Sequence, residues 1–405
     1  MVDLVRIPSV TGTAAESDLQ HRQAAELARY GFDVDTWAFD LEALHANPSF
    51  PGTEADRTEG YGVVAMLAGE AGTTSPALVL QGHVDVVPTG ELGKWVDRDP
   101  FSALVSKSIL HGRGACDMKA GLAANMAVAR TLRASGLTLE RPFAVHTVVS
   151  EEDGGLGAFA TMLRGHTGDA AVITEPTSGR IVTANAGALT FALTVPGRAA
   201  HGSMRLEGVN ALDAFLPIYR RLRELETERN AHPDPLFRDL PLPYPISVGR
   251  VTAGNWASSV PDILVAEGRL GVQLGEDPAA ARAAFEAAIA DVSSTDPWLR
   301  DNPAVVTWPG GQFASGRLRD DHPFIDEVAT SITDLSGGRS PTRSAAPYGS
   351  DLRLYAGIGG IPCLHYGPGD VRFAHAPREQ VELAEVIRVT RALLLLAVRR
   401  CGGHF

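Results

Sequence analysis

The feature of this sequence that most limits the possible folds is a set of short apolar runs, each followed closely by an acidic residue or a histidine. The first run, Leu78 to Leu80, has the length and the lack of polar interruption of a buried strand. His83 and Asp85 follow it, one residue apart. If the extended conformation continues, two side chains at this spacing point to the same side. A histidine beside a carboxylate at the end of a strand is one half of a common kind of metal site.

Two later apolar runs also end in acidic side chains. Residues 142–149 are followed by Glu151 and Glu152, and residues 169–174 are followed by Glu175. Because the carboxyl ends of parallel strands share one edge of a sheet, we expect these acids to lie beside the end of the first run.

Two further candidates lie in loops that precede predicted helices. Asp117 belongs to RGACDMKAG, and His375 belongs to GPGDVRFAHAP. With the residues at the strand ends they supply two histidines and several carboxylates, a set that suits Zn²⁺, with Mn²⁺ or Co²⁺ as alternatives. So many carboxylates also indicate a two-metal site in which one carboxylate is the bridge.

Each of these residues also has a structural interpretation. A lone histidine such as His83 is more often a hydrogen-bonded residue than a ligand, and paired glutamates after a strand are usually solvated. Asp117 could be the N-cap of the next helix, and Glu175 with Pro176 could form a turn. Cys116 could be a thiolate ligand, but in an extended loop its side chain would point away from that of Asp117. The pattern shared by several segments, and no single residue, favours the metal site.

Composition limits the class of protein and its partners. The chain has 405 residues, 44% of them hydrophobic and 21% charged, so a globular protein with two domains is expected. Its formal net charge of −12 argues against nucleic acid or an anionic membrane as a partner. Three cysteines imply no disulfide framework. With neither a signal peptide nor an apolar run of membrane-spanning length, we expect a cytoplasmic protein.

Strand and helix patterns predict a two-part architecture. In residues 1–187 strands alternate with helices, which indicates an α/β domain with a mostly parallel sheet. Residues 188–302 read as strand, helix, two strands and helix, a small α+β unit. Residues 303–405 resume the α/β pattern and end in a helix predicted over about 378–400. The small unit is therefore predicted to be an insertion in the larger domain.

The motifs, taken in order, resemble one known family. They are GHVDVVP, GRGACDMKAG, SEEDGG, TEP, AHGS and FAHAP. The resemblance is to metallopeptidase family M20, which includes acetylornithine deacetylase, succinyl-diaminopimelate desuccinylase, aminoacylase-1 and carboxypeptidase G2. RLEGVNA, GNWASSVPD and EGRLG further resemble the deacylase subgroup that includes formylaminopyrimidine deformylase. The resemblance to this family implies a catalytic domain like that of zinc exopeptidases, with an inserted lid and dimerisation domain.

The resemblance also implies a role for each candidate in the larger domain. Two metal ions, most simply zinc, would be held as follows: His83 and Glu175 on one ion, Glu152 and His375 on the other, and Asp117 between them. Asp85 would fix the tautomer of His83. Glu151 would be the general base for a hydroxide that bridges the two ions and attacks the amide carbonyl.

In the inserted unit, the resemblance implies residues that contact the substrate. His201 would reach the active site of a partner subunit and stabilise the oxyanion, although without its motif it reads as a surface histidine. Asn255 and Arg269 would hold polar groups or a carboxylate of the substrate, although Arg269 could instead be an exposed strand residue. The turn Gly349-Ser350-Asp351 resembles a Gly-Thr-Asp turn of the family, and we assign it no role.

Three functions follow as hypotheses. The first is a two-metal deacylase that hydrolyses the amide of a small N-acylated amine or amino acid, acting as a homodimer. The second is a dipeptidase or carboxypeptidase of the same family, which would use the same site. The third is a non-catalytic binding protein, which predicts the loss of a ligand or of the base. No such loss is visible in the sequence.

Overall fold

The computed structural model describes residues 1–405, and the chain divides into two compact units. Unit 1 comprises residues 1–184, 317–344 and 350–405, and unit 2 comprises residues 185–316 and 345–349. The second unit ends later than residue 302 because two short strands after that point, β12 (Val305–Thr307) and β13 (Gln312–Phe313), pair with β9 (Gly187–Pro196).

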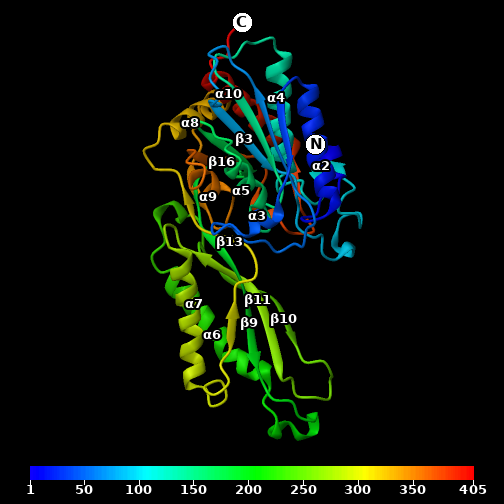
Figure 1. The fold of residues 1–405 in the computed structure, drawn as a ribbon, viewed down its shortest axis with the longest axis vertical. Coiled ribbons are helices and arrows are strands. Elements are labelled where there is room, and N and C mark those ends of the chain that lie inside the picture. Colours follow the sequence, from blue (N-terminus) through cyan, green and yellow to red (C-terminus); the bar gives the residue numbers. More distant parts are fainter. The chain divides into compact units, whose positions relative to one another are not determined.

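A nine-stranded mixed sheet with a parallel centre is the framework of unit 1 (Figure 1). The strand order is β1-β2-β6-β3-β7-β16-β8-β14, and β15 pairs with β8. The parallel strands at its centre are β6 (Phe143–Val148), β3 (Leu78–His83), β7 (Ala171–Pro176) and β16 (Cys363–Gly367). The outer strands are β1 (Asp33–Ala38), β2 (Tyr61–Leu67), β8 (Ile181–Asn185), β14 (Gly316–Arg317) and β15 (Arg343–Ala346).

Helices cover both faces of this sheet because its central strands are apolar on both sides. Leu78 and Leu80 of β3 pack in one core with α2 (Ala14–Arg29), α4 (Lys119–Ala134), α8 (Phe324–Leu335) and α10 (Leu383–Arg400). Val79, between them, packs on the opposite face with α5 (Leu156–Leu163) and α9 (Leu352–Ala356). This alternation is the two-residue period of a strand buried on both faces. Unit 1 is thus a three-layer α/β structure, as the sequence predicts.

Short elements complete unit 1. A small sheet joins β17 (Gln380–Glu382), β5 (Ile109–His111) and β4 (Val105–Ser106). Residues 380–382 are extended in this sheet, so the last helix begins at Leu383, later than its apolar pattern predicts. The short helices are α1 (Val2–Val5), α3 (Leu41–His45), η1 (Leu92–Lys94) and η4 (Val371–Phe373).

Unit 2 is an antiparallel sheet with two helices packed on it. The strand order is β10-β11-β9-β12, with β13 also paired to β9, where β10 is Ile246–Ala253 and β11 is Ile263–Val272. The helices α6 (Ala211–Arg229) and α7 (Pro278–Thr295) share one core with β9, β10 and β11. Two short helices, η2 (Gly202–Glu207) and η3 (Pro235–Phe237), lie in its loops. β10 is an edge strand and most of its residues are exposed.

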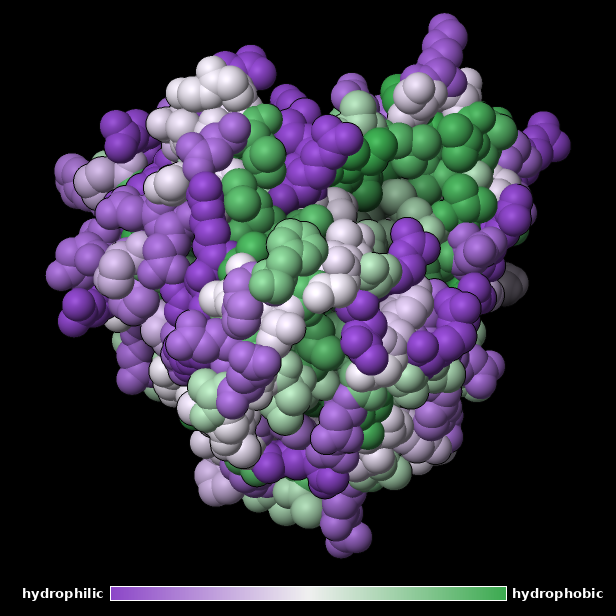
Figure 2. All heavy atoms as spheres, turned by 90° about the horizontal axis from the view of Figure 1, so that it is seen from above, coloured by the Kyte–Doolittle hydropathy of each residue, from purple (hydrophilic) through white to green (hydrophobic).

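Hydrophilic side chains dominate the surface seen from above, with smaller apolar areas between them (Figure 2). None of the helices combines the length and the apolar character needed to cross a lipid bilayer.

Candidate metal centre

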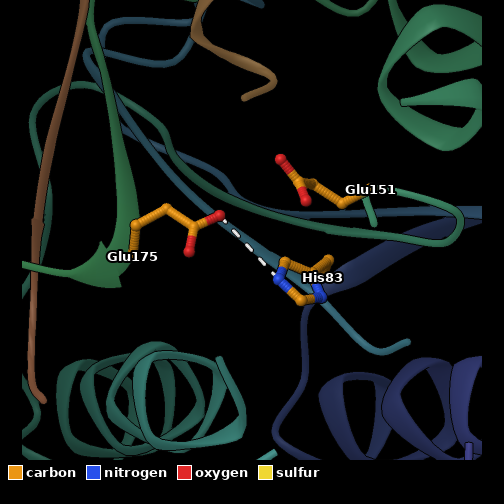
Figure 3. Close-up of side chains that lie close together, drawn as sticks. All are labelled: His83, Glu151 and Glu175. Carbon is orange, nitrogen blue, oxygen red and sulfur yellow. Dashed lines mark ion pairs between the residues drawn. The ribbon is translucent and has the colours of Figure 1, made fainter. Parts of the chain in front are cut away.

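The ends of three adjacent parallel strands bring acidic side chains to one histidine. His83 is the last residue of β3, Glu175 lies near the end of β7, and Glu151 follows β6 by a short turn. Their side chains point toward one another (Figure 3). One metal-binding atom from each of the three residues lies within 4.8 Å of those of the other two. The shared carboxyl edge of these parallel strands therefore brings the three side chains together.

Asp117 lies between the two histidines. Its Oδ1 is 3.3 Å from Nε2 of His83, and its Oδ2 is 3.6 Å from Nε2 of His375. His375 Nε2 also lies 3.0 Å from Oε2 of Glu152, and His83 Nε2 lies 3.8 Å from Oε1 of Glu175. One carboxylate thus faces two separate His–Glu pairs, which is an arrangement that can hold two cations.

The charges of the cluster also suit cations. Glu151 and Glu175 are almost completely buried, and no lysine or arginine pairs with either carboxylate. Burial raises the pKa of Glu151 well above its usual value, and the nearby Glu175 and Asp351 raise it further. Burial likewise raises the pKa of Glu175, with repulsion from Asp117 adding to it. A divalent ion among these oxygens would offset both effects, so the donor set fits a metal that accepts nitrogen and oxygen ligands.

His83 is oriented with Nε2 toward the acidic cluster. Its Nδ1 lies 3.0 Å from the main-chain oxygen of Asp85 and 3.5 Å from Oδ1 of the same residue. A proton on Nδ1 can therefore be donated to Asp85, which leaves Nε2 as the ligand atom. The nearer acceptor is the carbonyl oxygen, whereas the sequence predicts the carboxylate.

The Asp85 carboxylate has a further task that the sequence did not reveal. It accepts the main-chain N–H groups of Glu151 and Glu152, each at 3.2 Å, and the hydroxyl of Thr11 at 3.0 Å. Asp85 therefore fixes the acidic pair as well as the first histidine.

The turn that carries Glu151 and Glu152 is anchored by residues that are not among the predicted site residues. Ser150 has a left-handed backbone with φ of 61°, and its N–H donates to Oε1 of Glu16 at 2.9 Å. Arg353 donates to the carbonyl oxygen of Gly154 at 2.6 Å. The carboxylate of Asp153 accepts the N–H groups of residues 54 and 55. Asp153 could have been suspected from its place in SEEDGG, but no local pattern marks Glu16 or Arg353.

The other predicted site residues belong to unit 2. His201 is exposed at the start of η2, and its Nδ1 lies 2.8 Å from Oγ of Ser203. Asn255 is exposed in the turn after β10. Arg269 of β11 is partly buried and donates to the carbonyl oxygen of Pro347 at 3.1 Å, and its buried Nε has no partner. The predicted site residues of unit 1 thus lie close together in the structure. His201, Asn255 and Arg269 belong to unit 2.

Comparison with known proteins gives the family of the chain. The model of "Peptidase family M20/M25/M40" matches residues 79–399, so the chain belongs to this family. An N-formyl-4-amino-5-aminomethyl-2-methylpyrimidine deformylase of Halalkalibacterium halodurans is 28% identical over 364 residues, which cover 84% of this chain and 82% of that protein. An acetylornithine deacetylase of Yersinia pseudotuberculosis is 30% identical over 341 residues, covering 80% of this chain and 79% of that protein.

Solved structures show the same fold at low identity. The di-peptidase Dug1p of Saccharomyces cerevisiae matches with a TM-score of 0.77 at 14% identity, covering 99% of this chain and 95% of that one. The YXEP protein of Bacillus subtilis, described as a dinuclear metal-binding peptidase of the M20 family, matches with a TM-score of 0.58 at 14% identity, covering 99% of this chain and 97% of that one.

Proposed function

We propose that this protein hydrolyses the amide bond of a small N-acylated amine or amino acid with the help of two divalent metal ions. The observation that carries the proposal is the position of Asp117 between two His–Glu pairs at the carboxyl edge of the sheet. The deacylating relatives support the choice of an N-acyl substrate.

In this proposal each ion has one histidine and one glutamate of its own. His83 and Glu175 would hold the first ion, Glu152 and His375 would hold the second, and Asp117 would be a ligand shared by both. The ions are most simply zinc, because imidazole and carboxylate ligands suit it, and Co²⁺ or Mn²⁺ would be substitutes. When bound, such ions polarise an amide carbonyl and lower the pKa of water.

Glu151 is proposed as the general base. Its carboxylate is buried in the cluster beside His83 and Glu175, and no lysine or arginine pairs with it, so it is placed to accept a proton there. Glu151 would accept the proton of the attacking water and pass it to the leaving nitrogen. Its place beside His83 and Glu175 would also allow Glu151 to be a metal ligand. An experiment must therefore decide which of Glu151 and Glu152 is the base and which is the ligand.

Unit 2 is proposed to contact the substrate. No carboxylate of the chain pairs with the Arg269 guanidinium, and its Nε has no hydrogen-bond partner. A carboxylate or another polar group of the substrate would be a suitable partner for this guanidinium. Asn255 would hold a further polar group, and His201 would stabilise the oxyanion in the active site of a second subunit.

We also propose a reducing, cytoplasmic location, because all three cysteines are buried free thiols.

A peptidase that cleaves dipeptides or a C-terminal residue is the second candidate, because it would use the same metal site. The match to a di-peptidase is at 14% identity and supports the fold alone, whereas the relatives named above are deacylases. A non-catalytic binding protein ranks below both, since every proposed ligand and the proposed base are present.

A substrate panel tests the proposed function. The purified protein, freed of metal with a chelator and then supplied with zinc, cobalt or manganese, is assayed on N-formyl, N-acetyl and N-succinyl amines and amino acids beside dipeptides. We expect hydrolysis of at least one N-acyl compound, lost on chelation and restored by metal. Turnover that survives metal removal would contradict both hydrolase hypotheses, and activity on dipeptides alone would favour the peptidase.

Paired substitutions separate the base from the ligand. Glu151→Gln should lower kcat by about 10²–10⁴-fold, the usual contribution of a general base, while bound metal stays at the level of the unaltered protein. Glu152→Gln should instead lose metal, because it removes a charged ligand next to His375. Metal content by elemental analysis and kcat are measured on both variants. Metal loss in the first and full occupancy in the second would reverse the two roles.

A homodimer through unit 2 is proposed from its exposed apolar side chains. Leu212, Leu216 and Tyr219 lie at helical spacing on the outer face of α6, with exposed fractions of 43%, 42% and 38%. The opposite face of this helix is buried in the core of unit 2. The exposed edge strand β10 could also pair with its copy in a second subunit.

Sedimentation tests the dimer. We expect a dimer for the unaltered protein and a monomer for Leu216→Glu, because a charge would be buried at the interface. Leu335→Glu, at a leucine of α8 with 45% exposure in unit 1, is the matched control and should stay dimeric. If the unaltered protein sediments only as a monomer, His201 cannot act in a partner's active site.

A further inference from the structure

A buried ion pair joins the loop of Asp117 to the loop of His375. Arg113 and Glu379 have exposed fractions of only 2% and 1%, and Nη1 of the arginine lies 2.5 Å from Oε2 of the glutamate. The guanidinium also donates to the carbonyl oxygen of Pro88 at 3.2 Å.

The second carboxylate oxygen of Glu379 holds the main chain at Asp117. Its Oε1 accepts the N–H of Cys116 at 3.0 Å and the N–H of Asp117 at 3.1 Å. Two main-chain donors thus converge on one oxygen at the residue whose own carboxylate faces both histidines. A charged acceptor makes each of these bonds stronger than a neutral one would.

Main-chain bonds of Glu379 fasten the same two loops. Its N–H donates to the carbonyl oxygen of Ala376, directly after His375, at 3.1 Å, and its carbonyl oxygen accepts the N–H of Gly112 at 3.1 Å. His83 lies within β3, where its pairing with Val148 of β6 fixes the backbone, and Glu175 lies within β7. Asp117 and His375 lie outside the strands and helices and have no such support.

We propose that Glu379 is a positioning residue that fixes Asp117 relative to His375 and thereby sets the affinity for the metal ion between them. The inference rests on the proposed two-metal function. A metal site tolerates only small errors in the placement of its ligands, and residues that orient ligands typically change metal affinity by about 10–100-fold when they are substituted. Glu379 itself binds no ion in this account.

Unit 2 offers a matched control for a merely structural ion pair. Arg229 Nη2 lies 2.5 Å from Oε2 of Glu276, and that same oxygen accepts the N–H of Gln273 at 2.7 Å. This pair has the same chemistry as the pair of Glu379, but it supports none of the proposed metal ligands.

The experiment compares Glu379→Gln with Glu276→Gln in the full chain. Zinc affinities are measured by competition with a chromogenic chelator, the visible spectrum is recorded after loading with Co²⁺, and hydrogen exchange is followed in the metal-free protein. Glu379→Gln should lower the affinity for one of the two zinc ions by about tenfold or more and change the visible spectrum of the Co²⁺-loaded protein. It should also speed hydrogen exchange at the amides of Cys116 and Asp117. Glu276→Gln should leave both zinc affinities and the spectrum unchanged, even if it lowers the unfolding midpoint.

Two results would overturn the inference. If Glu379→Gln is folded by circular dichroism and binds both ions as the unaltered protein does, Glu379 does not position the site, while the proposed function stands. If the unaltered protein binds no divalent ion, the proposed function fails and the inference with it. Should Glu379→Gln not fold, Glu379→Asp, which keeps the charge but shortens the reach, is measured in the same way, and unchanged zinc affinities in it would count against the inference.

Discussion

Repulsion among buried carboxylates is the constraint on which the rest of the site depends. Glu151, Glu152, Glu175 and Asp117 share a small volume with two histidines, and burial raises the pKa of each of the three glutamates. Such a group of acids stays together only if the fold holds each one and cations or bound protons balance the charge. The parallel strands of unit 1 supply the first condition, and the proposed metal ions supply the second.

The fold divides this work between strands and loops. Strand β3 places His83, which is paired with Val148 of β6, and strand β7 places Glu175 near its carboxyl end. The acids after β6 depend instead on main-chain bonds to Asp85 and Glu16, and Asp117 depends on Glu379. Hydrogen-bonded carboxylates that hold a loop are thus a recurring device at this edge of the sheet. The strands position some of the site residues, and hydrogen bonds to buried carboxylates fix the loops that carry the others.

The sequence could predict the part of the site that follows from local periodicity. Short apolar runs locate β3, β6 and β7, and the convergence of His83, Glu151 and Glu175 follows because parallel strands share one carboxyl edge. Asp117 and His375 lie in loops with no such period. They were candidates by residue type, and only the resemblance to a family assigned each of them to a particular ion. Glu16 and Arg353 act across more than a hundred residues of chain, and no local pattern reveals contacts of that range. The start of the last helix was misplaced because residues 380–382 pair with another strand, which is a tertiary effect.

Anomalous X-ray scattering from crystals of the metal-loaded protein tests directly whether two metal ions bind at this edge of the sheet. We expect two peaks in each chain, about 3.5–4 Å apart, one beside His83 and Glu175 and the other beside Glu152 and His375, with Asp117 between them. A single peak, or peaks away from the carboxyl edge of the sheet, would contradict it.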